Sequence, residues 1–175
     1  MPFAAVALTR VETVYLALGT NLGDRAANLR LARAALSPDF TLEAVSSIYE
    51  TEPAYVLDQP RFYNQVLRAT TALTPLAALR RLKAIEADLG RTAGTRFGPR
   101  LIDLDLLLYG AVELATSELT LPHPRLAERP FVLIPLAEIA PTLVHPDLGL
   151  TMAALRDRLG DTRAAIWPAP PAANV

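Results

Sequence analysis

The order of strand-like and helix-like segments constrains the fold of this chain more than any other feature of its sequence. Stretches rich in β-branched and aromatic residues predict strands, and apolar residues three or four positions apart predict helices. These patterns predict strand, helix, strand, strand, helix and strand over residues 11–18, 24–36, 41–51, 62–73, 74–89 and 101–109. This βαββαβ order is typical of ferredoxin-like folds. We therefore expect an α/β protein, an α+β sandwich whose mostly antiparallel sheet has helices packed on it.

Capping residues and glycines mark the ends of the predicted helices. Asp24 and Thr74 can accept hydrogen bonds at the first turns of their helices, and Gly90 suits the end of the second. Beyond the core we expect short strands near 112–114 and 118–121, and helices over 130–139 and 151–159. We treat residues 1–175 as a single domain, with 1–10 a short N-terminal extension and about 161–175 a loose C-terminal tail.

The composition excludes several classes of protein. The 175 residues include no Cys and only two His, which excludes a disulfide framework, a thiolate nucleophile and a Cys- or His-rich metal site. A net charge of −1 lacks the basic excess of a nucleic-acid or membrane-surface binder. No apolar run of about 18 residues predicts a transmembrane helix, and the start MPFAAVALTR lacks the basic region of a signal peptide. We expect a cytoplasmic monomer that binds neither nucleic acid nor membranes.

The clearest predicted strand, Leu101–Tyr109, places two carboxylates on one of its faces. Side chains alternate along a strand, so the even-numbered residues from Ile102 to Leu108 would share a core face. Asp103 and Asp105 would share the opposite face, about 7 Å apart, where they repel each other unless a cation or a proton intervenes. Their oxygen atoms suit Mg²⁺, which keeps some waters and takes phosphate oxygens from a substrate. The alternative is an exposed face whose acids only confer solubility.

Basic residues flank this acidic face in the sequence. A glycine-containing loop leads into the strand and a proline-rich segment follows it, and together they carry Arg91, Arg96, Arg100, His123, Arg125 and Arg129. Guanidinium groups opposite a metal are what a Mg–polyphosphate substrate requires. The alternative is a solvated face with internal ion pairs. RNA binding is disfavoured because no aromatic pair is interleaved with the basic residues.

A third segment, residues 51–64, mixes aromatic and amide side chains. Phe62 and Asn64 fall on one side of the strand that they begin. A ring that stacks beside an amide that hydrogen-bonds predicts a pocket for a heterocycle. Packing in the core is an equally good interpretation of Phe62.

Ordered motifs over residues 15–146 give the chain a resemblance to a known family. They are Tyr15-Leu-Ala-Leu-Gly-Thr-Asn-Leu-Gly23, Ser46-Ser-Ile-Tyr-Glu-Thr51, Asp58-Gln-Pro-Arg-Phe-Tyr-Asn64, Ile85-Glu86, Gly90-Arg91, Arg96-Phe-Gly-Pro-Arg-Leu-Ile-Asp-Leu-Asp105, Leu121-Pro-His-Pro124, Arg129-Pro-Phe131 and Pro135-Leu-Ala-Glu-Ile-Ala-Pro141. The block that ends in Asp-Leu-Asp is the most specific of them. In these motifs and in their order, the sequence resembles the 6-hydroxymethyl-7,8-dihydropterin pyrophosphokinases of folate biosynthesis.

The resemblance implies a reaction and its partners. Such enzymes transfer the terminal diphosphate of ATP to the hydroxymethyl group of 6-hydroxymethyl-7,8-dihydropterin and release AMP. ATP would be the co-substrate, and two Mg²⁺ ions would bind Asp103 and Asp105. The rival interpretations are another Mg-dependent phosphoryl-transfer enzyme, such as a nuclease or phosphatase, and a non-catalytic ferredoxin-like ligand-binding module.

The resemblance also implies roles for individual residues. The residues implied in catalysis are Arg91, Arg100, Asp103 and Asp105. ATP and its phosphates would contact Lys83, Glu86, Arg91, Arg96, Phe97, Arg100, Ile102, His123 and Arg129. The pterin would lie between Phe62 and Phe131, with Gly19, Thr51, Glu52, Pro53 and Asn64 around it.

Overall fold

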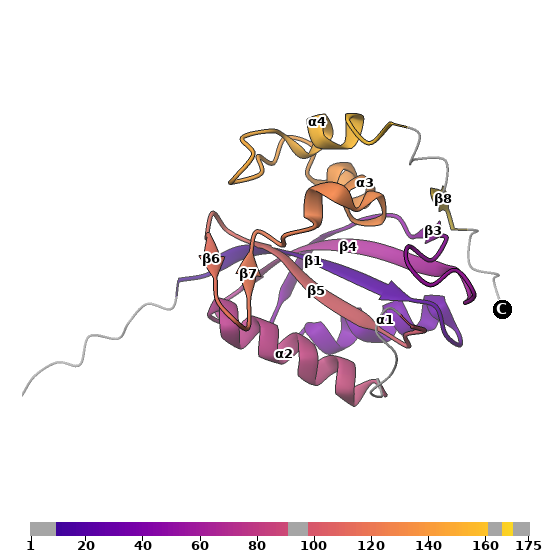
Figure 1. Ribbon diagram of the computed structural model, residues 1–175. Helices are drawn as coiled ribbons and strands as arrows, with labels where there is room; N and C mark the ends of the chain where they lie inside the picture. Colours follow the sequence, from indigo (N-terminus) through magenta and orange to yellow (C-terminus); the bar gives the residue numbers. More distant parts are fainter. Residues whose placement is uncertain (1–9, 91–97, 161–165, 170–175) are drawn as a thin grey trace, which may run out of the picture.

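The structure is a computed structural model, and it describes residues 10–90, 98–160 and 166–169 (Figure 1). Its strands are β1 (Glu12–Thr20), β2 (Thr41–Val45), β3 (Tyr49–Thr51), β4 (Phe62–Thr71), β5 (Asp103–Tyr109), β6 (Leu114–Ala115), β7 (Thr120–Leu121) and β8 (Ile166–Pro168). Its helices are α1 (Arg25–Leu36), α2 (Pro75–Asp88), α3 (Pro130–Ile139) and α4 (Met152–Asp157), with a 3₁₀ turn at Leu126–Glu128. None of the described helices is long and apolar enough to cross a membrane.

One antiparallel sheet organises the chain. Its strands follow the order β5-β1-β4-β3-β8, and β2 also pairs with β4. Helix α1 connects β1 to β2 with β4 between them, and α2 connects β4 to β5 with β1 between them. Two interleaved units of this kind make the ferredoxin-like βαββαβ fold, so the predicted fold class is confirmed.

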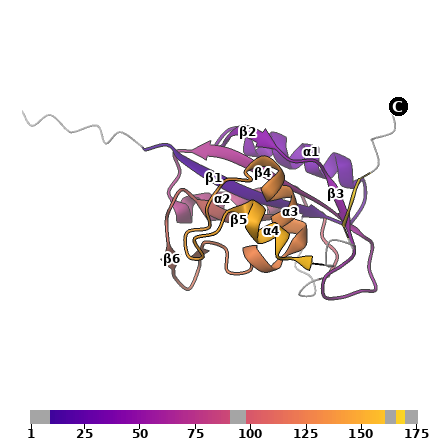
Figure 2. The same cartoon turned by 90° about the horizontal axis from the view of Figure 1, so that it is seen from above.

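Helices cover both faces of the sheet. In Figure 1, α1 and α2 lie below it, and α3 and α4 lie above it; Figure 2 looks down on the latter pair. The apolar cluster under α1 and α2 includes Val14, Leu16, Leu18, Leu29, Leu36, Phe40, Leu67, Leu82, Ile85, Ile102, Leu104 and Leu106. The cluster under α3 and α4 includes Tyr15, Val66, Leu107, Leu108, Leu126, Val132, Leu133, Leu136, Met152 and Leu155.

The predicted helix ends are confirmed by their hydrogen bonds. Asp24 accepts from the backbone N–H of Ala27 at 2.9 Å, and Thr74 caps the next helix through its hydroxyl. Gly90 follows that helix with φ +95°, a backbone conformation that glycine adopts without steric cost. These signals are local, so they could be interpreted without knowledge of the tertiary structure.

The predicted strand over 41–51 was wrong, because it is divided into β2 and β3. At the division, the hydroxyl of Ser46 accepts from the backbone N–H of Val66 at 3.0 Å, a role that a backbone carbonyl plays in a regular ladder. The Ser46 N–H still donates to the Val66 carbonyl at 2.9 Å. The side chain therefore replaces one ladder bond, and β3 resumes the pairing with β4.

The predicted shared face of the even-numbered residues in β5 was wrong at Leu108. The register of β5 against β1 shifts between Tyr15 and Leu16, so two residues of β5 are accommodated where regular pairing has one. Leu106 therefore packs under α1 and α2, whereas Leu107 and Leu108 both pack under α3 and α4. Asp103 and Asp105 precede the bulge, and the alternation predicted for them holds.

The predicted C-terminal tail was wrong in part, because β8 pairs antiparallel with β3. Its Pro168 is the register partner of Tyr49, and the N–H of Ala169 donates to the Ile48 carbonyl at 2.9 Å. The predicted helix over 151–159 is shorter in the structure, and the two predicted short strands are displaced to β6 and β7. Strands that pair across more than 100 residues of sequence leave no local pattern from which the pairing could be predicted.

Candidate active site

A cavity of about 270 Å³ opens at the end of the sheet where β1 and β3 end and β4 and β5 begin. The start of α3 and the loop after β3 complete its walls. It is lined by Ala17, Leu18, Gly19, Thr51, Glu52, Ala54, Tyr55, Gln59, Phe62, Asn64, Gly98, Arg100, Asp103, Asp105, His123, Arg129, Phe131 and Val132. Residues predicted from three separate segments of sequence therefore line one cavity.

The remaining predicted site residues fall into two groups. Arg91, Arg96 and Phe97 lie outside the described residues. Lys83, Glu86, Ile102 and Pro53 are described but are not among the lining residues above. Ile102 is buried in the core under α1 and α2.

The two predicted carboxylates lie opposite the smallest residues of β1. Asp103 is the register partner of Gly19, and Asp105 is the register partner of Ala17. A side chain at Gly19 would place its Cβ 3.2 Å from Oδ1 of Asn64, which is tighter than ordinary packing allows. Small residues on β1 therefore leave room for the cavity beside the acidic face of β5.

The environment of Asp105 is suited to a cation. Burial, and after it the negative charge of Asp103, raise the pKa of Asp105 to about 6 against the opposing positive charges of Lys83 and Arg129. No cluster of three or more His, Cys, Asp or Glu side chains occurs among the described residues. Two carboxylates alone fit Mg²⁺, which takes its remaining oxygen ligands from water and phosphate.

Glu86 and Lys83 hold the strand that carries these acids. The buried Glu86 accepts at Oε1 from the backbone N–H of Leu104 at 2.6 Å and from Nζ of Lys83 at 3.0 Å. The same Nζ donates to the Leu104 carbonyl at 3.2 Å. Since Leu104 lies between Asp103 and Asp105, the pair fixes the backbone from the far side of β5.

A neutral histidine and an arginine whose Nε is buried face the acids. The Nδ1 of His123 accepts from the backbone N–H of Arg125 at 3.2 Å, which leaves the proton of the neutral ring on Nε2. Burial lowers the pKa of His123 to about 4, with Arg129 and Arg125 acting in the same direction. Nε of Arg129 is buried and makes no hydrogen bond with the described residues. Its guanidinium lies 5.6 Å from the centre of the Phe131 ring.

The opposite wall carries the aromatic and amide residues. Nδ2 of Asn64 donates to the hydroxyl of Thr51 at 2.7 Å, and both side chains are buried. The Asn64 amide is thus fixed with Oδ1 beside Gly19. Phe62, the first residue of β4, and Phe131, the second residue of α3, line the cavity from different elements.

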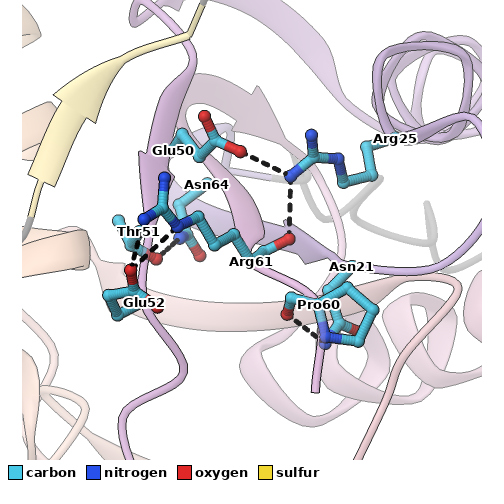
Figure 3. A network of polar contacts seen from close by, with 8 residues as sticks. All are labelled: Asn21, Arg25, Glu50, Thr51, Glu52, Pro60, Arg61 and Asn64. Carbon is cyan, nitrogen blue, oxygen red and sulfur yellow. Dashed lines mark hydrogen bonds and ion pairs between the residues drawn. The ribbon is translucent and has the colours of Figure 1, made fainter. Parts of the chain in front are cut away.

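The loop from Glu52 to Arg61 is held by polar contacts at both ends (Figure 3). Nε of Arg61 donates to Glu52 at 2.8 Å, which joins the ends of the loop to each other. Nη1 of Arg25 donates to Glu50 at 3.0 Å and to the Arg61 carbonyl at 2.8 Å. The loop is therefore fixed to α1 and to β3 while its middle lines the cavity.

One family model matches most of this chain. The family model for 7,8-dihydro-6-hydroxymethylpterin-pyrophosphokinase (HPPK) matches residues 15–141. The chain belongs to the HPPK family.

This chain has relatives of very different lengths. It is 48% identical over 127 residues to a 2-amino-4-hydroxy-6-hydroxymethyldihydropteridine pyrophosphokinase of Bacillus subtilis, covering 71% of this chain and 76% of the relative. It is 47% identical over 140 residues to a mitochondrial folate synthesis bifunctional protein of Pisum sativum, covering 79% of this chain. The chain spans only 27% of the length of that pea protein.

A solved structure supports the fold. The HPPK-DHPS of Plasmodium falciparum, crystallised with pteroate, matches with a TM-score of 0.71 and 17% identity, over 88% of this chain and 43% of that one. The HPPK match over 15–141 includes every lining residue named above, whereas α4 and β8 lie beyond it.

Sequence reasoning missed Asn21, which links three segments around the cavity. Its buried side chain donates to Gln59 at 3.0 Å and to the Pro60 carbonyl at 2.9 Å, and its Oδ1 accepts from the N–H of Arg100 at 2.7 Å. The turn after β1, the Glu52–Arg61 loop and the segment before β5 therefore meet at one amide. An Asn between two glycines indicates a turn, and that interpretation concealed its tertiary contacts. Asn21 does not line the cavity; the lining residues that were not predicted are Ala17, Leu18, Ala54, Tyr55, Gln59, Gly98 and Val132.

Proposed function

We propose that this chain transfers the terminal diphosphate of ATP to the hydroxymethyl group of 6-hydroxymethyl-7,8-dihydropterin and releases AMP, as a step of tetrahydrofolate biosynthesis. Membership of the HPPK family and the name of the Bacillus subtilis relative support this activity. The observation that carries it is one cavity with an aromatic and amide wall at one side and a carboxylate pair with cationic neighbours at the other. A flat, polar-edged heterocycle and a Mg–polyphosphate require those two kinds of wall.

The aromatic half of the cavity would bind the pterin. Phe62 and Phe131 would stack on the ring, and the fixed amide of Asn64 would hydrogen-bond to its polar edge together with Thr51. Gly19 keeps that edge accessible because any side chain there would meet Asn64. Glu52 and Pro53 would support the same wall.

The charged half would bind the triphosphate. Asp103 and Asp105 would hold two Mg²⁺ ions, whose charge would offset that of the triphosphate when they are bound. Arg100 and Arg129 would contact phosphate oxygens as cations, and His123 would donate from Nε2 as a neutral ring. Arg91, Arg96 and Phe97 remain predictions for this half, as does a contact of ATP with Lys83, Glu86 or Ile102.

The main requirement of this reaction is that the two substrates are held in the correct relative position. The hydroxymethyl oxygen attacks the β-phosphorus. The bond between the β-phosphorus and the oxygen that bridges it to the α-phosphate breaks, and AMP leaves. The hydroxyl proton passes to a phosphate oxygen or to solvent. The chain contributes by aligning the two substrates and by placing Arg100, Arg129 and His123 where negative charge develops.

Product identity tests the proposal. Incubation with ATP, Mg²⁺ and the reduced hydroxymethylpterin should yield AMP and pterin diphosphate in equal amounts, with no AMP when the pterin is omitted. Production of ADP, or no nucleotide turnover, would contradict the proposal. A nuclease would cut nucleic acid without the pterin, and a binding module would bind the pterin without producing AMP. The monomeric state and the cytoplasmic location also stay predictions.

A further inference from the structure

Two of the motifs found in the sequence have, apart from Thr51, no role in the proposed reaction. Of Ser46–Thr51 only Thr51 lines the cavity among the described residues, and of Pro135–Pro141 none does. The structure brings the two motifs together at one carboxylate, that of Glu138 near the end of α3.

Glu138 accepts hydrogen bonds from three donors of the β2–β3 segment. Its Oε1 accepts from the backbone N–H of Ser47 and from the Ser47 hydroxyl, each at 2.9 Å. Its Oε2 accepts from the hydroxyl of Tyr49 at 2.7 Å. Burial and Glu138 raise the pKa of Tyr49 to about 12, so the phenol keeps its proton through the neutral range. The Glu138 carboxylate, Ser47 and Tyr49 are called the α3–β3 clamp below.

On both α3 and β3, the clamp residue lies on the same side of the element as a residue that lines the cavity. Glu138 follows Phe131 by seven residues, which is close to two helical turns, so both side chains project from nearly the same side of α3, about 10 Å apart along its axis. Tyr49 and Thr51 are two apart on β3 and therefore share a face. One end of the α3–β3 contact is thus the clamp, and the other end includes Phe131 and Thr51, which line the cavity.

Apolar packing alone does not fix this contact. Val132, Leu133 and Leu136 are buried and hold α3 on the sheet. Burial of apolar surface is non-directional, so it opposes separation of the helix from the sheet more than a small slide or rotation along it. Hydrogen bonds to a carboxylate are short and directional, and three of them to one side chain define the position of α3 against the three-residue strand β3.

We propose that Glu138 is a positioning residue which, through the α3–β3 clamp, sets the spacing between the Phe131 wall and the Thr51–Asn64 wall and thereby the affinity for the pterin. This inference rests on the proposed function. Asp103 and Asp105 lie on β5, away from β3 in the sheet order, and of the groups assigned to the triphosphate only Arg129 adjoins α3, so the clamp acts chiefly on the pterin half of the site.

Steady-state kinetics of Glu138→Ala test the inference. We expect the KM for the pterin to rise about tenfold, with the KM for ATP and kcat at saturating pterin within about twofold of wild type, since a small displacement of one wall changes binding at that wall. Tyr49→Phe removes one donor of three and should raise the KM for the pterin about threefold. The double variant should resemble Glu138→Ala, because both changes break the same link.

Two further variants separate positioning from loss of stability. Glu138→Gln keeps one acceptor oxygen for Ser47 and should restore part of the pterin affinity. Asp39→Ala is the matched control, since Asp39 accepts from Nε of Arg81 at 2.6 Å on the opposite face of the sheet. It should lower the unfolding temperature without changing either KM. Circular dichroism shows whether each variant is folded, and if Glu138→Ala is not, Tyr49→Phe decides.

The outcomes that overturn the two proposals differ. A wild-type chain that forms AMP, together with an unchanged KM for the pterin in Glu138→Ala and Tyr49→Phe, would overturn the clamp alone. Equal increases in both KM values would do the same, because they indicate a general loss of structure. A wild-type chain that forms no AMP would overturn the proposed function.

Discussion

The two faces of the sheet use the same strands for different purposes. Toward α1 and α2, alternate residues of β1 from Val14 to Leu18 form one continuous apolar cluster. Toward α3 and α4, the intervening residues of β1 change along the strand from Tyr15 in the core to Ala17 and Gly19 at the cavity. The first face is core throughout, whereas the second changes from core to site within a single strand.

The same change from core to site occurs on the two strands that flank β1. On β5, Asp103 and Asp105 line the cavity and Leu107 lies in the core; on β4, Asn64 lines it and Val66 lies in the core. Helix α3 begins at Pro130; it packs on the apolar half through Leu133 and Leu136, whereas Phe131 in its first turn lines the cavity. The comparison indicates that changes on the first face should alter stability, and changes at the open end of the second should alter function.

Replacement of Asp105 by Asn should separate activity from stability most strongly. We expect turnover to fall at least about 1000-fold, because a ligand that offsets the charge of the triphosphate is lost. In EDTA the same variant should need more denaturant to unfold than wild type, since a buried charge beside Asp103 is removed. AMP formation and urea unfolding measure the two effects. Near-normal activity would refute the metal assignment, and a lower urea midpoint would refute the interpretation of the buried charge.

Leu82 of α2 provides the opposite case on the first face. Its side chain is fully buried in the cluster under α1 and α2. Leu82→Ala should lower the free energy of unfolding by about 2–5 kcal/mol, through lost burial and the cavity left behind. At a temperature where the variant is folded, kcat and both KM values should stay within about twofold of wild type. A selective loss of activity in the folded variant would show that the two faces are not independent.

Local signals in the sequence were sufficient for most of the fold. The cap at Asp24, the cap at Thr74 and the alternation through Asp103 and Asp105 depend only on near neighbours, and the structure has all of them. The divided strand at Ser46 and the bulge at Leu107 depend on what the partner strand presents. Such features are set by packing and pairing, and hydrophobic alternation does not encode them.

The site shows the same distinction. Asp103 and Asp105 were found because acids on an otherwise apolar strand are conspicuous, and His123 because it stands among the basic residues after that strand. The resemblance supplied Phe131. Asn21 was missed because an amide in a turn has the same local pattern whether or not it joins distant loops. The clamp formed by Glu138 was missed because its partners are about 90 residues away in the sequence.

Ending the chain at Gly160 tests whether the edge of the sheet at β3 contributes to the site. The truncation removes β8 and leaves one edge of β3 unpaired. Because β3 carries Thr51, we expect the KM for the pterin to rise about threefold and the unfolding temperature to fall by a few degrees. The KM for ATP serves as the internal control. An unchanged KM for the pterin would show that β4 and the clamp alone are sufficient to hold β3.

The smallest expected effect concerns His145, a buried titratable group on the second face. Burial lowers the pKa of His145, and its Nδ1 accepts from the backbone N–H of Leu148 at 3.3 Å. The unfolded chain therefore binds more protons once the pH falls below the ordinary pKa of about 6.5, and the folded state loses stability there. His145→Asn keeps an acceptor and cannot titrate, so its stability should fall less than that of wild type between pH 7.5 and 5. The difference between the two chains, measured by urea unfolding at each pH, cancels the contributions of Asp105 and His123. Parallel curves would show that His145 does not contribute to the acid sensitivity of this chain.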